Sequence, residues 1–372
     1  MSKLKILECF GGIGACSKAL ERLGIDYEIA DYVEIDKYAV KSFNAIHGTN
    51  FEPQDITKWD KDIKVDLIMH GSPCQDFSLA GKQAGGDKDS GTRSSLMYET
   101  IRIVEKLKPK YVIWENVKNL LSKKHRHNFD AYLETMEQLG YTNYYQVLNA
   151  KDYGIPQNRE RVFTVSILDN QTDKSGFVRR FVKEFEFPPK QELKLKLRDM
   201  LEDDVDEKYY LSESKIQKIA NWRAYQKPFE KVQGKNSIVP TLTARGAGEE
   251  HSGMITYSEN LEDTTNLQEE CLKVGLFDDT SSNSFAKGKR DYGYKNEYGT
   301  LKCSPKYSIY KNTDLRIRKL TPKEVWRLMG FDDEDFEKAA KVNSNSQLYK
   351  QAGNSIVVNV LEAILNNLLN QK

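Results

Sequence analysis

The sequence predicts an α/β protein built around a doubly wound parallel sheet. Short apolar runs alternate with amphipathic helical patterns along the first third of the chain, which is typical of strand–helix–strand units. A glycine-rich turn at Phe10–Gly14 joins the first apolar run to the first helical pattern. Helical patterning stops near residue 187 and returns near residue 321, so a second, smaller domain is expected between these points.

The elements of the first region follow from apolar spacing and from the residues that stop a helix. Gly24 ends the first helix, and Pro109 ends a helix in which Leu96, Ile101 and Val104 recur near helical spacing. Each strand is a short apolar run followed by polar or glycine-rich sequence. We expect strands at 5–10, 27–34, 65–70, 111–114, 144–148 and 161–167, and helices at 15–23, 37–47, 94–107 and 128–139.

Regular structure is predicted again after the middle region. In Thr321-Pro322-Lys323-Glu324, a threonine N-cap, a proline at the first helical position and an acid in the first turn indicate a helix start. A last apolar helix is expected at Ser355–Leu369, capped by Gly353–Ser355. The predicted domains are therefore residues 1–186 together with 318–372, and residues 187–317.

The composition is that of a globular, intracellular protein. A chain of 372 residues with 39% hydrophobic residues can bury a substantial core. Its five cysteines form no CxxC pair and its five histidines are scattered, so neither a disulfide framework nor a metal site is expected. The N-terminal residues lack a signal-peptide pattern, and no stretch approaches about 18 uncharged apolar residues. We therefore expect a cytoplasmic protein without a membrane segment.

Charge is segregated along the second half of the chain, although the net charge is only +1. Residues 286–320 hold ten Lys/Arg against three Asp/Glu and are interleaved with five tyrosines. Residues 249–279 hold nine Asp/Glu and one Lys. A basic segment with aromatic residues suits contact with phosphates and stacking on bases. The alternative is an ordinary solvated surface.

One cysteine stands where α/β enzymes place reactive groups. Cys74 lies in Pro73-Cys74-Gln75, shortly after the predicted strand at 65–70. Thiolates attack carbon, so Cys74 is a candidate nucleophile if its pKa is lowered or its proton has an acceptor. The alternative is a buried, unreactive side chain, because free cysteines are among the most buried residues.

The glycine turn and two acids indicate a site for an adenosine-containing ligand. The turn precedes a helix N-terminus, where a ligand can approach the backbone closely. Glu34 ends the second predicted strand, where a carboxylate can accept both ribose hydroxyls. Asp55-Ile56 follows in a loop, from which Asp55 can contact an adenine amino group. A tight turn and two surface acids are the alternative.

A further carboxylate and two arginines lie at the ends of predicted strands. Glu115 follows its strand at the same sheet edge as Cys74. Arg159 and Arg161 alternate on the way into a strand, so their side chains point to one face and can hold a substrate carbonyl or the carboxylate. The alternatives are a helix N-cap or surface acid for Glu115, and a charged strand edge for the arginines.

Eight motifs occur in order along the chain: Phe10-Gly11-Gly12-Ile13-Gly14, Glu34, Asp55, Pro73-Cys74-Gln75, Glu115-Asn116-Val117, Gln157-Asn158-Arg159-Glu160-Arg161, Arg318-Lys319-Leu320-Thr321-Pro322 and Gly353-Asn354-Ser355. This ordered set resembles the DNA (cytosine-5)-methyltransferase family, over residues 3–168 and 318–369. The resemblance implies a Rossmann-like, S-adenosylmethionine-dependent methyltransferase domain with a mixed, mostly parallel sheet. It also implies that residues 187–317 form a smaller, inserted target-recognition domain.

The resemblance implies methyl transfer from S-adenosylmethionine to C5 of cytosine. C5 is a poor nucleophile, so Cys74 first adds to C6 of a cytosine that has flipped out of the duplex. Glu115 would contact N3 and the exocyclic amine, while Arg161, with Arg159 as a second candidate, would hold the O2 side. C5 then takes the methyl group and loses its proton, Cys74 is expelled, and S-adenosylhomocysteine is the product. No metal is required.

The resemblance also assigns residues to the cofactor and to DNA. Residues 75–91 match the family's mobile loop, which closes over the flipped base. Of two Thr-Leu pairs that are candidates for reading DNA, the spacing to Arg318 favours Thr300 and the Thr-Leu-Thr-Ala-Arg context favours Thr241. The residues implied for the cofactor are Phe10, Gly11, Gly12, Ile13, Gly14, Glu34, Ile35, Asp55, Ile56, Pro73, Asn354 and Ser355. The residues implied for DNA are Gln75, Ser78, Thr241, Arg245 and Thr300.

The sequence thus predicts a monomeric methyltransferase that acts on a short sequence in double-stranded DNA. A cognate restriction endonuclease of the same system is a candidate partner, without a physical complex. A tRNA cytosine-5 methyltransferase of the same superfamily is the alternative, although the chain lacks the Cys-Phe-Thr signature of those enzymes. A dinucleotide-dependent oxidoreductase would leave Cys74 and Glu115 unexplained, and a catalytically silent DNA-binding module would have no need of them.

Overall fold

The structure, a computed structural model, describes residues 3–73, 96–172, 178–180, 184–212, 232–233, 236–242, 256–258 and 317–370. The chain folds into two compact units. The first contains Met1–Leu195, Pro240–Gly253 and Val325–Lys372, and the second contains Lys196–Val239 and Met254–Glu324. Compared with the predicted domains, the first unit also takes in residues 187–195 and 240–253, and the second takes in 318–324.

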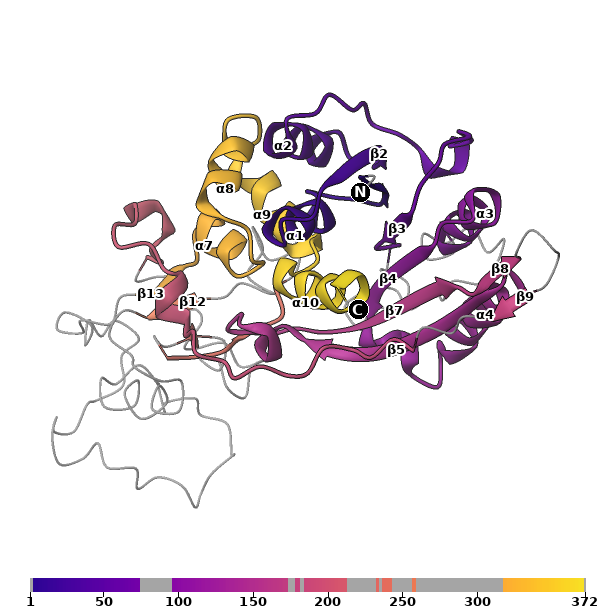
Figure 1. Cartoon of the computed structure of the whole chain (residues 1–372). Coiled ribbons are helices and arrows are strands. Elements are labelled where there is room, and N and C mark those ends of the chain that lie inside the picture. The colour runs from indigo at the N-terminus through magenta and orange to yellow at the C-terminus, as the bar shows by residue number, and fades with distance from the viewer. Residues whose placement is uncertain are drawn as a thin grey trace, which may run out of the picture. The chain divides into compact units, whose positions relative to one another are not determined.

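A six-stranded mixed sheet lies at the centre of the first unit (Figure 1). It contains β1 (Leu4–Cys9), β2 (Tyr27–Val33), β3 (Leu67–His70), β4 (Tyr111–Val117), β5 (Tyr141–Asn149) and β7 (Glu160–Leu168) in the order β2-β1-β3-β4-β7-β5. The first four strands in this order pair in parallel, and β7 is antiparallel to β4 and β5. The predicted α/β fold with a mixed sheet is therefore confirmed.

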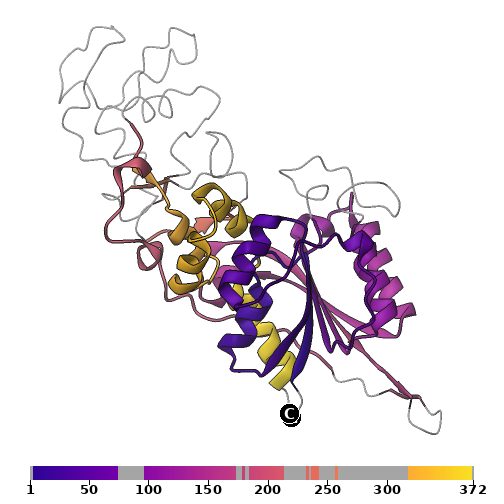
Figure 2. The ribbon, with the colours of Figure 1, turned by 90° about the horizontal axis from the view of Figure 1, so that it is seen from above.

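Helices cover both faces of this sheet (Figure 2). The crossover helices are α1 (Ala15–Arg22), α2 (Lys37–His47), α3 (Met97–Leu107) and α4 (Arg126–Gln138). On the face covered by α3 and α4, the strand residues Leu7, Ile68 and Val112 pack with Ile103 and Phe129 in one buried cluster. These apolar strand residues thus form the core under α3 and α4.

The predicted strands and helices of this region are found within a few residues of their expected ends. The main difference is β4, which continues through Glu115 and Asn116 to Val117, whereas the predicted strand stops at Trp114. Both polar residues are buried because β4 pairs with β7 along its whole length. The remaining short strands are β6 (Gln157–Asn158), β8 (Asn170–Thr172), β9 (Val178–Arg180) and β11 (Val239–Pro240).

The C-terminal segment contains α7 (Pro322–Arg327), α8 (Asp333–Ala340), α9 (Asn345–Asn354) and α10 (Val358–Asn370). The helix start predicted at Thr321 is therefore present. The predicted cap of the last helix is wrong, because Asn354 ends α9, Ser355 is its C-cap, and α10 begins only at Val358. The sequence pattern missed α9 because few of its residues are apolar, although Leu348 and Ala352 are buried.

The stretch Asn345–Asn370 has the length and composition of a membrane span, with a mean hydropathy of 1.2. In the structure it comprises two helices, and 56% of its most apolar window is buried inside the protein. In α10, Leu361, Ile364 and Leu365 are completely buried, and this helix packs along α1. We therefore interpret α10 as a core helix.

The described part of the second unit contains a three-stranded sheet. Its strands are β10 (Val232–Gln233), β12 (Thr256–Ser258) and β13 (Ile317–Lys319), in that order. Arg318 on β13 forms a buried ion pair with Glu324, with nitrogen–oxygen distances of 2.8 and 2.7 Å. Glu324 also accepts the Thr321 backbone N–H at 2.7 Å. Residues 318–324 belong to the second unit because β13 pairs with β12 and the Glu202 backbone N–H donates to Glu324 at 2.9 Å.

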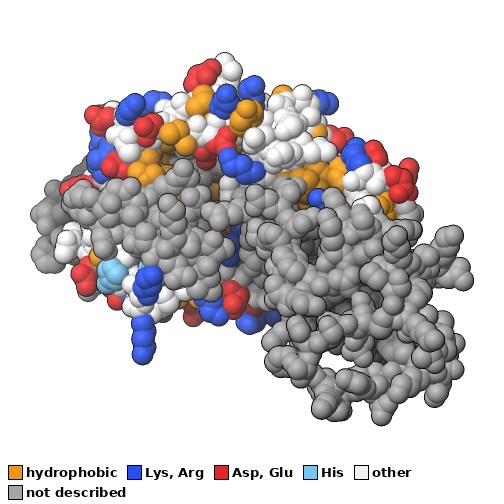
Figure 3. Space-filling view, turned by 180° about the vertical axis from the view of Figure 1, so that it is seen from behind, with side chains coloured by type: hydrophobic (Ala, Val, Ile, Leu, Met, Phe, Trp, Pro, Cys, Tyr) orange, Lys and Arg blue, Asp and Glu red, His pale blue; other side chains and the backbone are white. Residues whose placement is uncertain are grey.

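The described surface carries both signs of charge. On the face shown in Figure 3, acidic and basic side chains are interspersed. Most of the basic, tyrosine-rich segment at 286–320 lies outside the described residues. The described part of this face therefore carries no large patch of a single sign of charge.

Candidate active site

The glycine turn between β1 and α1 leaves space for a ligand at a helix N-terminus. Gly12 has a φ of 56°, and no described atom would lie within 4 Å of a Cβ at this position. Gly11 packs so closely on Tyr32 that a Cβ there would come 2.7 Å from the Tyr32 ring. The turn thus needs glycine at Gly11 for packing, and a side chain at position 12 would point into open space.

Glu34 connects this turn to the start of α2. Its carboxylate accepts the Gly12 backbone N–H at 3.2 Å and the Asp36 backbone N–H at 2.8 Å. Burial raises the pKa of Glu34, against the effect of these hydrogen bonds. The next residue, Ile35, is 69% exposed, which is unusual for a large apolar side chain. A carboxylate beside an exposed apolar side chain suits a ribose with an attached base.

The loop that carries Asp55 and Ile56 lies beside Glu34. The Gln54 backbone N–H donates to the Glu34 carbonyl oxygen at 2.8 Å. The Asp55 carboxylate accepts the Thr57 backbone N–H at 3.0 Å, and hydrogen bonds from Thr57 lower its pKa. Asp55 therefore stays ionised near neutral pH, and the structure brings it close to the other acid predicted to bind the cofactor.

Helix α9 brings the C-terminal segment to the same sheet edge. Lys350 forms an ion pair with Asp36 at 2.6 Å, and the Gln351 side chain donates to the Tyr38 carbonyl oxygen at 2.9 Å. Beyond the end of α9, Ile356 contacts Gly71 at the end of β3, where a Cβ would lie 3.6 Å from the Ile356 Cδ1. Asn354 and Ser355 thus lie between the start of α2 and the end of β3.

The residues just before Cys74 are held against β4. The Trp114 indole N–H donates to the Ser72 hydroxyl at 2.9 Å, and the Asn116 amide donates to the Ser72 carbonyl oxygen at 3.3 Å. A Cβ on Gly71 would lie 3.8 Å from Glu115 Oε2. The segment that leads through Pro73 into Cys74 therefore passes next to Glu115. Cys74, Gln75, Ser78, Arg245 and Thr300 lie outside the described residues.

Glu115 and Arg161 form a largely buried ion pair across the antiparallel pair β4 and β7. The register places Glu115 opposite Phe163, so Arg161, two residues away on the same face, is its diagonal neighbour. Arg161 Nε lies 3.0 Å from Glu115 Oε1. Burial raises the pKa of Glu115, although the positive charges of Arg161 and Arg159 oppose this. A carboxyl group with a raised pKa can hold and donate a proton.

Arg159 is buried and binds backbone carbonyl groups. Its guanidinium donates to the carbonyl oxygens of Leu242 at 2.8 Å, Ser355 at 2.7 Å and Gly353 at 3.3 Å. Thr241 lies in the same place, because its hydroxyl donates to the Asn158 carbonyl oxygen at 2.9 Å. The structure thus brings Thr241, Arg159 and Ser355 together, and it gives Arg159 three contacts that hold chain segments in position.

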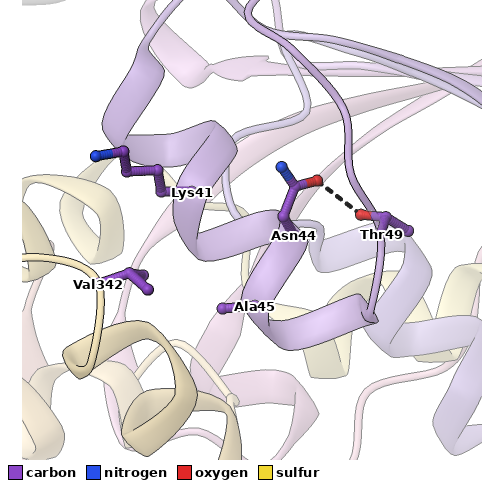
Figure 4. Close-up of a pocket in the computed structure, with 5 residues that line it drawn as sticks. All are labelled: Lys41, Asn44, Ala45, Thr49 and Val342. Carbon is purple, nitrogen blue, oxygen red and sulfur yellow. Dashed lines mark hydrogen bonds between the residues drawn. The ribbon is translucent and has the colours of Figure 1, made fainter.

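Neither a metal-binding group nor the hollow on α2 belongs to this site in the part of the chain that the structure describes. Among the described residues, no group of three or more His, Cys, Asp or Glu side chains is arranged to hold a metal ion. An open hollow on α2, shown in Figure 4, includes none of the residues predicted to bind a cofactor. It is lined by Lys41, Asn44, Ala45, Thr49 and Val342.

Three residues that support the site were not predicted from the sequence. Tyr32 donates from its hydroxyl to the Gly12 carbonyl oxygen at 2.6 Å, and Ser72 and Trp114 hold the segment before Cys74. Tyr32 and Trp114 stand within apolar strand runs, where they look like ordinary core residues. Only the strand register and the turn geometry show their second role.

Comparisons with known proteins agree with this geometry. The profile of the family described as C-5 cytosine-specific DNA methylase matches residues 4–370. The orphan methyltransferase M.SPBetaI of Bacillus phage SPbeta is 34% identical, over 99% of this chain and 98% of its own length. The type II methyltransferase M2.ScrFI of Lactococcus lactis subsp. cremoris is 33% identical, over 98% of this chain and 99% of its own length.

Two solved structures share the fold. A variant of DNMT2 from Spodoptera frugiperda has a TM-score of 0.69 at 23% identity, covering 98% of this chain and 99% of its own. The methyltransferase EhMeth of Entamoeba histolytica also has a TM-score of 0.69, at 16% identity, covering 100% of this chain and 99% of its own. At these identities, the two structures show that this chain shares their fold.

Proposed function

Because the chain belongs to the C-5 cytosine-specific DNA methylase family, we propose that it methylates C5 of cytosine within a short sequence of double-stranded DNA. The observation that carries this proposal is the buried Glu115–Arg161 pair beside Gly71, three residues before Cys74. A proton donor, a fixed cation and the approach to a cysteine thus meet at one sheet edge. This is the combination that addition of a thiolate to a cytosine ring needs.

The residues at the glycine turn fit S-adenosylmethionine, which supplies an electrophilic methyl group when bound. Gly12 would face the methionine part, Glu34 would accept the ribose hydroxyls, and Ile35 would lie against the adenine. Asp55 and Ile56 would contact the adenine edge. Open space at Gly12 and the 69% exposure of Ile35 support this assignment. Pro73, Asn354 and Ser355 complete the proposed set.

In the proposed reaction, the Cys74 thiolate forms a bond to C6, and the electron pair of the C5–C6 double bond moves into the ring. Protonated Glu115 donates to N3 as this charge develops, and Arg161 holds the O2 side. C5 then bonds to the methyl group as the bond between this methyl and the sulfonium sulfur breaks, which leaves S-adenosylhomocysteine, and N3 returns its proton to Glu115. Loss of the C5 proton to a base restores the double bond and expels Cys74 as thiolate.

The two described cysteines at the glycine turn are poor alternatives as nucleophile. Cys9 and Cys16 are both buried, and burial raises the pKa of each thiol. A thiol that stays protonated does not attack carbon. This supports Cys74 as the nucleophile of the reaction.

Arg159 has a different role in this proposal. Its contacts with Leu242, Gly353 and Ser355 support a positioning role that aligns the cofactor and DNA segments. Thr241 lies beside Asn158, and both Thr241-Leu242 and Thr300-Leu301 stay candidates for reading DNA. We further propose that residues 187–317 recognise the target, and that the enzyme is a cytoplasmic monomer whose system can include a restriction endonuclease.

Transfer of tritium-labelled methyl groups to different nucleic acids tests the substrate. We expect the purified protein to label unmethylated genomic double-stranded DNA and to leave tRNA unlabelled. Digestion of the product to nucleosides should place the label in 5-methylcytosine. Label found in tRNA and absent from DNA would contradict the DNA assignment and favour the tRNA enzyme.

A further inference from the structure

Asp31 is a buried carboxylate on β2 that no step of the proposed reaction uses. It is 2% exposed, and it accepts hydrogen bonds from three side chains of the loop after α2. Its Oδ2 lies 2.7 Å from both the Trp59 indole nitrogen and Lys61 Nζ. Its Oδ1 accepts the Gln54 amide N–H at 3.0 Å. Three donors from one loop therefore converge on one strand residue.

The same loop carries Asp55 and Ile56. Gln54 immediately precedes them, and its backbone N–H donates to the Glu34 carbonyl oxygen. On the other side, the Ile56 carbonyl oxygen accepts a hydrogen bond from Arg102 of α3 at 3.0 Å. Anchors before and after these residues therefore set where Asp55 and Ile56 lie.

Asp31 is the anchor whose loss would release most of this loop. Without its carboxylate, the buried Trp59 indole N–H would lose its acceptor, which is costly inside a protein, and the Gln54 amide would keep only the Tyr32 carbonyl oxygen at 2.6 Å. The loop can recover those hydrogen bonds by moving towards water. The strand beneath would stay in place, because β2 is paired with β1 through its backbone.

We infer that Asp31 is a positioning residue for the cofactor, which fixes Asp55 and Ile56 where the adenine ring binds by holding Gln54, Trp59 and Lys61. This inference rests on the proposed function, because it takes the ligand to contain adenosine. Asp31 acts through the loop. Its loss therefore weakens cofactor binding more than it affects the reaction of bound substrate.

Binding of S-adenosylhomocysteine to the full-length chain, measured by titration calorimetry at a temperature where all variants are folded, tests this inference. Asp31→Asn keeps the side-chain size but removes the charge that binds three donors, and we expect Kd to rise at least about tenfold. Trp59→Phe keeps the ring and removes one donor, and we expect Kd to rise about threefold.

Asp66→Asn is the matched control. The Asp66 carboxylate also accepts a hydrogen bond, from the Lys5 backbone N–H at 2.9 Å, but Asp66 lies just before β3, away from the strand ends that carry the cofactor residues. We expect this variant to lose thermal stability without a change in Kd. A raised Kd in Asp31→Asn together with an unchanged Kd in Asp66→Asn separates positioning from general destabilisation.

Two failures are distinguishable. If the wild-type chain binds S-adenosylhomocysteine and both Asp31→Asn and Trp59→Phe bind it equally well, the role of Asp31 is overturned. If the wild-type chain does not bind it, the cofactor assignment is overturned, and the inference with it. Should Asp31→Asn fail to fold, an unchanged Kd in Trp59→Phe overturns the inference.

Discussion

At the scale of single residues, Glu115 experiences two opposing effects. Its burial favours the neutral acid, whereas Arg161 at 3.0 Å favours the carboxylate. The net direction is a raised pKa, which keeps a fraction of the molecules protonated at a pH where an exposed glutamate is ionised. Glu115 can then donate a proton to the base while Arg161 keeps its place.

Glu115→Gln tests this role. Glutamine keeps the shape and a hydrogen-bond donor but transfers no proton, so we expect kcat to fall about 100-fold or more, with the KM for S-adenosylmethionine nearly unchanged. The activity of the wild type should fall as pH rises through the raised pKa of Glu115, because only the protonated carboxyl group donates a proton. The variant should not show this fall. Glu134→Gln, an exposed change on α4, is the control. Equal kcat values for Glu115→Gln and the wild type would contradict the role.

Glu8 predicts a pH dependence of folding stability. It is buried under the start of α1, where the Ser17 backbone N–H donates to it at 3.1 Å, and burial raises its pKa to about 7. The folded state therefore keeps this proton while an unfolded glutamate, with a pKa of 4.5, has lost it. Stability contributed by Glu8 is present at low pH and is lost as pH rises from about 4.5 to 7.

Glu8→Gln should remove that dependence. When pH rises from 4.5 to 7.5, the wild type should lose up to about 3 kcal/mol of its free energy of unfolding through Glu8, and the variant should not lose it. Urea unfolding at both pH values measures the difference. The same pH dependence in both proteins would show that Glu8 titrates normally.

Residues of the site could be predicted from the sequence only where their role depends on neighbours in the chain. Glu34 and Glu115 were predictable because an acid at the end of a strand is visible in the sequence. Asp31 and Tyr32 were not, because their partners Trp59 and Gly12 lie 28 and 20 residues away. Both look like ordinary strand residues until the loop or turn that they hold is seen.

At the scale of elements, strand pairing decides where the site lies. The predicted strand before Glu115 stopped too early because Glu115 and Asn116 look like loop residues, yet pairing with β7 keeps them in β4. The contact of Arg159 with Leu242 joins residues 83 positions apart. No local pattern reveals such a contact, and the predicted role of Arg159 as a second substrate-binding group stays a prediction.

An ion cluster joins α1, which follows the glycine turn, to α8. Lys18 is 5% exposed and lies 2.8 Å from Asp332 and 3.0 Å from Asp335. Lys18→Met would leave buried Asp335 without its cation, and we expect a loss of about 3–5 kcal/mol in the free energy of unfolding. Denaturant unfolding measures this loss.

The matched control for this prediction is Lys338→Met on α8. Lys338 pairs with Glu334 at 2.9 Å on the exposed surface of the helix, so its loss should cost less than about 0.5 kcal/mol. Similar losses in both variants would mean that the buried cluster does not hold α8 against α1.

At the scale of the whole molecule, the first unit could be predicted from the sequence more completely than the second. The alternation of strands and helices predicted the first unit, because a buried parallel sheet needs continuous apolar strands. The extent of the second unit was less predictable, since Arg318 joins it through the pairing of β13 with β12, which are far apart in the sequence. The net charge of +1 does not point to an anionic partner, and the expectation that the basic segment at 286–320 meets DNA stays a prediction.

The most direct test of the central claim is a base-resolution map of 5-methylcytosine. Unmethylated genomic DNA is incubated with S-adenosylmethionine and either the wild-type protein or Cys74→Ser, and then sequenced after bisulfite treatment. We expect methylation at one short sequence with the wild type and none with Cys74→Ser, although that variant still binds DNA. Unmethylated DNA after incubation with folded, cofactor-bound wild type, or methylation retained by Cys74→Ser, would contradict it.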